Sequence, residues 1–198
     1  MIQLIYGDDI LKVKVGVSNR HVHLSRFDYE LLFDTEMECE KELSQVGEYK
    51  SNKRVCLKTD KGVICDVAVL GPCRDYTQVE ISKTDAYFFG ISPQVRSSGD
   101  VSCGEYITIV GEKGEIIRDC CIIATRHIHI SHEDRVKYGL LDDLYSVKVL
   151  GVKPGILGDV HIKEIDNGCF ELHLDRDDAN AFMLKNGDLV EIIDNIKK

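Results

Sequence analysis

Alternation of apolar and polar residues with a period of two dominates this chain and predicts mostly short β-strands. Residues 11–17 show it clearly, since Lys12 and Lys14 alternate with valines. Alternation or short apolar runs predict further strands at 54–58, 63–70, 78–82, 106–110, 116–123, 146–150, 160–164, 170–174 and 189–193. Turn sequences separate them, namely Asp60-Lys61-Gly62, Glu112-Lys113-Gly114, Asp166-Asn167-Gly168 and Asn186-Gly187-Asp188.

Four short helices are predicted between these strands, at residues 28–33, 83–89, 132–138 and 177–184. Ser25 and Ser131 precede the first and third helices, and serine is a preferred N-cap residue. Gly90 and Gly139 stand where the second and third helices should end. The pattern therefore indicates a mainly β protein with a few short helices.

One polar phrase occurs twice, as NRHVHLS at residues 19–25 and as TRHIHIS at residues 125–131. Both copies alternate like a strand, so the two histidines of each copy point to the same face. Two imidazoles on one face are a ready chelate for a transition metal. The alternative is a pair of exposed or hydrogen-bonded strand histidines that bind no metal. The second, near-identical copy of the phrase favours metal binding over this alternative. The repeat predicts two related metal half-sites, formed by His21 with His23 and by His127 with His129.

The repeat also suggests that the fold arose by duplication. The turns at residues 60–62 and 112–114 resemble one another as well, and closely spaced strands are typical of closed barrels, which leave no sheet edge exposed. The chain has only three prolines and no linker-like tract. We therefore expect two small closed β-barrels, packed together and capped by short helices.

Composition and charge exclude some functions. The chain is 43% hydrophobic, which is enough for a globular core, and its net charge is −9. The acidity and the lack of a basic run argue against nucleic-acid or membrane-surface partners, whereas anionic substrates stay compatible because a metal would supply positive charge. No signal peptide or membrane-length apolar run is visible, so we expect a cytoplasmic protein.

The eight cysteines form no C-x-x-C pair. Without a secretion signal they are expected to be reduced thiols, and most of them to be buried packing residues.

Several other polar residues are candidates for completing a site. In residues 171–175, Glu171, His173 and Asp175 share one polar face, and His173 is the best third ligand, although a solvated edge strand would look the same. Glu80 lies between Val79 and Ile81 and could join His21 and His23, or pair with Lys83. Arg74 could bind a phosphate bidentately or lie in water. The loop at residues 96–100 could line an anion pocket, whereas His132 and His161 are interpreted as surface and structural residues.

Together these residues resemble a known family. Residues 15–25, VGVSNRHVHLS, are similar to the opening motif of the PduL-type phosphotransacylases. Residues 69–82, 95–100, 124–131 and 171–180 resemble its later motifs in the same order. The resemblance covers about residues 13–191. It implies a phosphate acyltransferase, which interconverts acyl-CoA and phosphate with acyl phosphate and CoA.

The resemblance also implies a fold and a site. The fold would be two β-barrels, one from residues 10–20 with 126–198 and one from 21–125, with a dinuclear zinc site at their interface. One zinc would be held by His21, His23 and Glu80, and the other by His127, His129 and His173. Arg74 matches the family's phosphate-binding arginine, and the CoA contacts would be Val17, Ser18, Asn19, Lys61 and Asn180.

The mechanism expected on this basis is direct attack of phosphate on the thioester of a short-chain acyl-CoA, acetyl or propanoyl. Two zinc ions and Arg74 would offset the repulsion between the anions. A dinuclear zinc hydrolase and a non-enzymatic metal-binding module are the alternatives. Residues 1–9 make no convincing amphipathic helix, so a cytoplasmic role is favoured over a bacterial microcompartment. The sequence does not determine the acyl chain, the native metal or the physiological direction of the reaction. It also leaves the oligomeric state open, with a homo-oligomer as one alternative.

Overall fold

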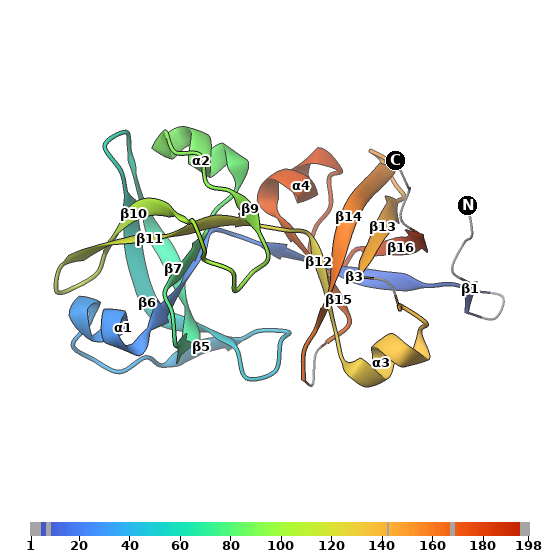
Figure 1. Cartoon of the computed structure of the whole chain (residues 1–198), viewed down its shortest axis with the longest axis horizontal. Coiled ribbons are helices and arrows are strands. Elements are labelled where there is room, and N and C mark those ends of the chain that lie inside the picture. The colour runs from blue at the N-terminus through green and yellow to red at the C-terminus, as the bar shows by residue number, and fades with distance from the viewer. Residues whose placement is uncertain (1–4, 7–8, 142, 167–168, 195–198) are drawn as a thin grey trace. The chain divides into compact units, whose positions relative to one another are not determined.

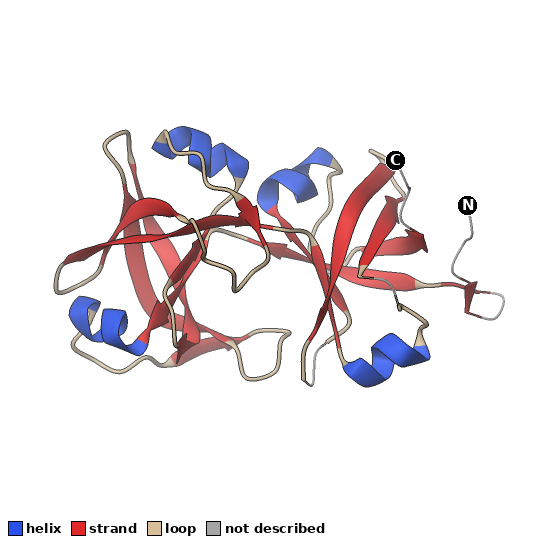
Figure 2. Cartoon of the chain, viewed as in Figure 1, coloured by secondary structure: helices blue, strands red, loops and turns tan. Residues whose placement is uncertain are grey.

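The computed structural model describes residues 5–6, 9–141, 143–166 and 169–194 of the chain. Two compact units make up the fold. The first unit consists of residues 1–18 with 125–198, and the second unit of residues 19–124. Strands dominate both units, and the helices are short (Figure 2).

The first unit is a closed barrel of six strands with two helices among its described residues (Figure 1). Its elements are β3 (Lys12–Ser18), β12 (His127–Ile130), α3 (His132–Lys137), β13 (Leu144–Val149), β14 (Gly155–Glu164), β15 (Glu171–Asp175), α4 (Arg176–Ala181) and β16 (Leu189–Asp194). The strands follow one another around the barrel in the order β12-β14-β13-β16-β3-β15. Val15, Ile128 and Leu172 lie in its fully buried core. A separate two-stranded antiparallel sheet pairs β1 (Ile5–Tyr6) with β2 (Asp9–Ile10).

The second unit is built around a barrel of the same kind. Its elements are β4 (His21–Ser25), α1 (Arg26–Leu32), β5 (Cys39–Glu42), β6 (Tyr49–Lys58), β7 (Val63–Arg74), β8 (Gln78–Glu80), α2 (Lys83–Phe89), β9 (Val95–Arg96), β10 (Glu105–Val110) and β11 (Glu115–Ala124). The strand order is β10-β11-β8-β4-β7-β6, and pairing of β10 with β6 closes the ring. Val22, Leu57 and Val69 are among its buried core residues.

The two barrels have one topology. β4 pairs in parallel with β7 and antiparallel with β8, and β12 pairs in the same two ways with β14 and β15. β3 precedes β4 in the chain but belongs to the first unit, and β11 precedes β12 but belongs to the second. Each repeat therefore contributes its leading strand to the other barrel. The expectation of two closed barrels with short helices is confirmed.

The two similar turns do not mark equivalent places in the two barrels, contrary to the sequence argument. Both lie in the second unit, where residues 60–62 join β6 to β7 and residues 112–114 join β10 to β11. The backbone N–H of Thr59 donates to Gly62 O, and that of Gly111 donates to Gly114 O. The resemblance between these turns follows from two tight hairpins of the same kind, so of these two sequence signals the histidine phrase is the one that marks the duplication.

All four predicted helices are present, and the two predicted serine N-caps have the expected chemistry. The Ser25 hydroxyl accepts from Asp28 N at 3.1 Å, and the Ser131 hydroxyl accepts from Asp134 N at 3.1 Å. Gly90 ends α2 in the left-handed region with φ of 66°. The fourth helix is the least accurate prediction, since α4 ends at Ala181 instead of continuing to residue 184.

Two strands of the second unit were missed because their sequences do not alternate. All four residues of β5 are exposed, and this strand forms by pairing with the edge of β6. β9 has two residues and pairs with β11. Predictions for residues 1–4 and 7–8 and for two residues of the turn at 166–168 fall outside the described residues. In the described part of the chain, none of the helices has the length and apolar character needed to cross a membrane.

The cysteine prediction is wrong about burial and about one pair, although the other six cysteines are free thiols. Cys56 and Cys65, on the paired strands β6 and β7, form a disulfide. Only Cys120 and Cys121 are buried, whereas Cys39 and Cys103 are exposed. Two cysteines nine residues apart form no recognisable sequence motif. Whether their sulfur atoms come close depends on the register of the β6–β7 hairpin, which the sequence pattern does not specify.

This arrangement predicts which thiols react in the native protein. Burial raises the pKa of Cys120 to about 12 and raises that of Cys121 as well, so at pH 8 almost no thiolate forms at either residue. Brief treatment with iodoacetamide should therefore modify Cys39 and Cys103 and spare the buried pair, as peptide mass spectrometry would show. Rapid modification of Cys120 or Cys121 without denaturant would contradict the buried placement.

Candidate active site

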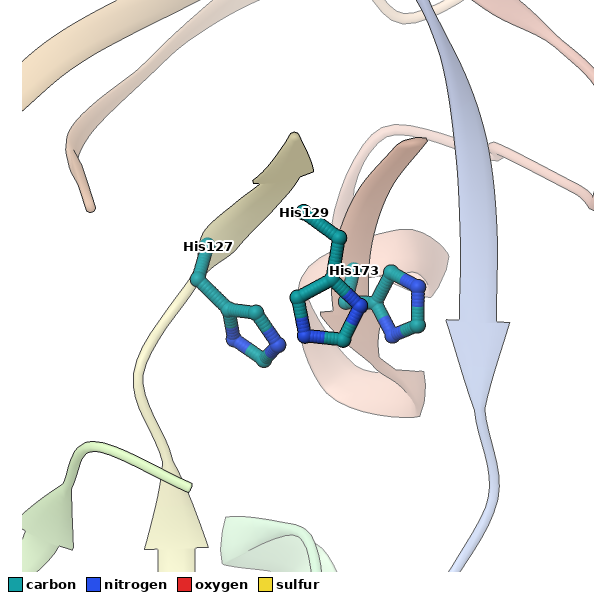
Figure 3. A group of neighbouring side chains, drawn as sticks. All are labelled: His127, His129 and His173. Atoms are coloured by element: carbon teal, nitrogen blue, oxygen red, sulfur yellow. The ribbon is translucent and has the colours of Figure 1, made fainter. Parts of the chain in front are cut away.

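Three histidines of the first unit converge on one point. His127 and His129 lie two residues apart on β12, and the antiparallel neighbour β15 places His173 directly opposite His127. One ligand atom of each lies within 4.8 Å of the others, and Figure 3 shows the three rings gathered together. His127 and His129 are 7% and 4% exposed. In the described residues, this is the one group whose ligand atoms approach so closely.

Two of these rings have close polar neighbours. Thr125 O lies 2.8 Å from His127 Nδ1, and Glu171 Oε2 lies 3.0 Å from His173 Nε2. Burial lowers the pKa of His173, but hydrogen bonds from its ring to Cys169 and Glu171 outweigh this effect and raise the pKa to about 9. A metal that binds His173 would therefore displace a proton.

The corresponding residues of the second unit are neighbours but converge less tightly. His21 and His23 lie on β4, and β8 places Glu80 opposite His21. His21 Nε2 and Glu80 Oε2 are 3.6 Å apart, and the two imidazole centroids are 5.1 Å apart. All three residues are at least nine-tenths buried. As in the other unit, a backbone carbonyl holds the first ring, with Asn19 O lying 2.8 Å from His21 Nδ1.

The arginine of each repeated phrase anchors a strand to a helix. Arg20 Nη2 lies 2.6 Å from Asp85 Oδ1, and Arg126 Nε lies 2.8 Å from Asp178 Oδ2. The two aspartates occupy equivalent places, in the first turns of α2 and α4. Hydrogen bonds to these aspartates raise the pKa of both arginines. The repeated arginine was the only sequence signal for these contacts, since the aspartates are distant in the chain.

Arg74 is held by neighbouring side chains. It was expected in a loop but is the last residue of β7. Its Nη2 donates to Glu48 Oε1 at 2.6 Å, and its Nη1 lies 3.4 Å from the Tyr76 hydroxyl. The Arg74 side chain is 21% exposed, so the alternative of an arginine lying free in water does not hold. Glu48 was missed because nothing in the sequence indicates its proximity to Arg74.

The residues expected to contact CoA are divided between the units. Val17 and Ser18 lie on β3 and Asn180 on α4 in the first unit, whereas Asn19 and Lys61 belong to the second. The backbone N–H of Val17 donates to Asn186 Oδ1 at 2.6 Å, and Lys61 and Asn180 are exposed. Their joint contact with CoA stays a prediction.

Three other candidates take specific places. The loop at residues 96–100 is fixed to β8, because Gly99 N donates to Gln78 Oε1 at 2.8 Å. His132 is exposed and its Nδ1 lies 2.9 Å from Glu164 Oε1. His161 was thought to have no partner in register, which is wrong, since it lies beside His127 on the parallel strand β14. It is nevertheless not one of the three converging histidines.

Comparisons with known proteins agree with the resemblance seen in the sequence. A family model described as phosphate propanoyltransferase matches residues 14–185. A phosphate propanoyltransferase of Thermotoga maritima is 46% identical over 185 residues, covering 91% of this chain and 88% of its own. A Rhodopseudomonas palustris protein of the same name is 40% identical, covering 94% and 84%, and one from Clostridioides difficile is 39% identical, covering 91% and 88%. The chain therefore belongs to the phosphate propanoyltransferase family, whose members are acyltransferases.

Proposed function

We propose that this protein transfers a short acyl group, acetyl or propanoyl, from CoA to inorganic phosphate, forming acyl phosphate, and also catalyses the reverse reaction. Two zinc ions would serve as cofactors, one held by His127, His129 and His173 and the other by His21, His23 and Glu80. The observation that carries the proposal is the convergence of the three histidines in a chain of this family. The proposed partners are acyl-CoA, phosphate and acyl phosphate.

The ligand groups suit the proposed metal. Imidazole and carboxylate are ordinary zinc ligands, and three protein ligands per ion leave a position open, as in catalytic zinc sites. When bound, zinc would supply Lewis acidity and positive charge for an anionic reaction.

The chain's own residues would act mainly by placing the phosphate. A phosphate oxygen attacks the thioester carbonyl carbon, a carbon–oxygen bond forms, the carbon–sulfur bond breaks, and CoA leaves as a thiolate. Arg74 is assigned to the phosphate because a guanidinium forms two parallel hydrogen bonds to it. Glu48 holds one edge of that guanidinium, which fixes its direction. Positioning of this kind can contribute about 7–11 kcal/mol in favourable cases.

A nucleophilic side chain is not needed for this reaction. Cys120 and Cys121 are poor candidates because burial raises the pKa of both thiols. The scheme therefore has no acyl-enzyme intermediate, and phosphate attacks the thioester directly.

Thiol release from acetyl-CoA and propanoyl-CoA, with and without phosphate, tests the proposal. We expect release only when phosphate is present, with acyl phosphate formed in equal amount. Release that needs no phosphate would indicate a hydrolase, and zinc binding without any release would indicate a metal-binding module. Either result would overturn the proposed function.

A further inference from the structure

We propose that Gln78 and Glu171 are paired positioning residues, each of which orients the third ligand of its half-site. This inference rests on the proposed metal sites. Gln78 precedes Glu80 by two residues on β8, and Glu171 precedes His173 by two residues on β15. The two barrels place them equivalently, since Gln78 lies opposite His23 and Glu171 lies opposite His129.

The contacts of Gln78 with Gly99 and Glu80 determine the orientation of its amide group. Its side chain is fully buried, its Oε1 accepts from Gly99 N at 2.8 Å, and its Nε2 donates to Glu80 Oε1 at 2.5 Å. A backbone N–H can only donate and a carboxylate can only accept, so the amide cannot be turned around. One oxygen of Glu80 is thereby held by Gln78, and the other, Oε2, faces His21 at 3.6 Å.

Glu171 contacts His173 at the corresponding place. Its Oε2 lies 3.0 Å from His173 Nε2, and its carboxyl group lies over Gly16 of β3, which is paired with His173. A Cβ atom at residue 16 would come within 2.8 Å of the Glu171 Cδ and Oε2 atoms. Gly16, part of the opening motif, therefore leaves the space in which this carboxylate lies.

The difference between the two residues follows the ligand that each one supports. A carboxylate ligand is oriented by a hydrogen-bond donor, and Gln78 provides an amide N–H. An imidazole ligand is oriented by an acceptor, commonly a carboxylate, and Glu171 provides one. The two barrels have the same topology, and the third ligand is Glu80 in one and His173 in the other. This difference in ligand explains why the supporting residue is a glutamine in one barrel and a glutamate in the other.

Reciprocal exchange of the two residues tests this assignment. Gln78→Glu keeps an oxygen for Gly99 N but sets a second carboxylate against Glu80, and Glu171→Gln keeps the size of the side chain but removes its charge. Each would be made in a background with one half-site, Gln78→Glu with His127→Ala and Glu171→Gln with His21→Ala. Competition with a chromophoric chelator would measure the zinc dissociation constant, which we expect each exchange to raise about 10–100-fold.

Matched controls come from the same two units. Glu164→Gln removes the carboxylate beside His132, a second carboxylate–histidine contact in the first unit that lies outside the three-histidine group. Gln94→Glu adds a charge at an exposed position in the second unit. Neither should change the zinc dissociation constant. The zinc dissociation constant of Gln78→Met, which removes the donor without adding charge, is measured as well. This variant keeps the test valid if Gln78→Glu does not fold.

A third variant disturbs Glu171 without altering any polar group. Gly16→Ala should displace the carboxylate and weaken zinc binding as Glu171→Gln does, and combining the two should add little further loss. Unchanged zinc dissociation constants for folded Gln78→Met, Glu171→Gln and Gly16→Ala would overturn the inference. Failure of the proposed function looks different, because the unmutated protein would then bind zinc without releasing thiol in a phosphate-dependent manner.

Discussion

Replacing His127 with alanine is expected to remove one zinc equivalent and nearly all phosphate-dependent thiol release. The ring is 7% exposed and belongs to the one tightly convergent histidine group of the described residues, so its loss leaves that group with two ligands. Removing a single group that stabilises developing charge typically costs about 10²–10³ in kcat. Loss of a whole ion should cost at least about 10³. Elemental analysis and the thiol-release assay, performed on the same preparation, would measure both losses.

His132→Ala is the matched control for this variant. His132 lies in the same unit, contacts Glu164, and is exposed. The His132→Ala variant should retain both zinc ions and phosphate-dependent thiol release. If His127→Ala kept a full complement of zinc and normal turnover, the metal assignment of the first unit would be wrong, even if the family's reaction were observed.

Most of the fold was accessible from the sequence because its signals are local. Strand alternation and serine caps depend on residues that are close in the chain, and they located most strands and the starts of the helices. The repeated phrase carried more information, because β4 and β12 occupy the same place in two barrels of one topology. β5 was not predictable in this way, since it exists only through its pairing with β6.

The candidate site was only partly predictable, for the same physical reason. Alternation correctly put Glu171, His173 and Asp175 on one face, but it did not distinguish their roles. Asp175 caps α4 by accepting from Asp178 N at 2.8 Å, and Glu171 contacts His173. These roles depend on where the strand ends and on its register with β12. Likewise, Arg74 and Glu48 meet through the folding of the second barrel, and no local pattern connects them.

Replacing Arg74 with alanine should reduce kcat/KM for phosphate by about 10²–10³ while leaving the zinc content unchanged. The expectation follows from its proposed role, since a missing guanidinium removes both the charge that attracts phosphate and the paired hydrogen bonds that orient it. Arg74→Lys should recover only part of the loss, because an ammonium group carries the charge but cannot form the fork. Initial rates at varied phosphate concentration, with zinc measured in parallel, would separate phosphate binding from metal binding.

Arg54→Ala provides the matched comparison for Arg74→Ala. Arg54 lies on β6 in the same unit, its side chain is 25% exposed against 21% for Arg74, and it too is paired with a glutamate, Glu40. Losing it removes a similar ion pair without touching the proposed phosphate site, so kcat/KM should stay close to that of the unmutated protein. Equal losses in Arg54→Ala and Arg74→Ala would mean that Arg74 supports the barrel structure. A loss confined to Arg74→Ala, with zinc retained, would connect this guanidinium to the phosphate itself.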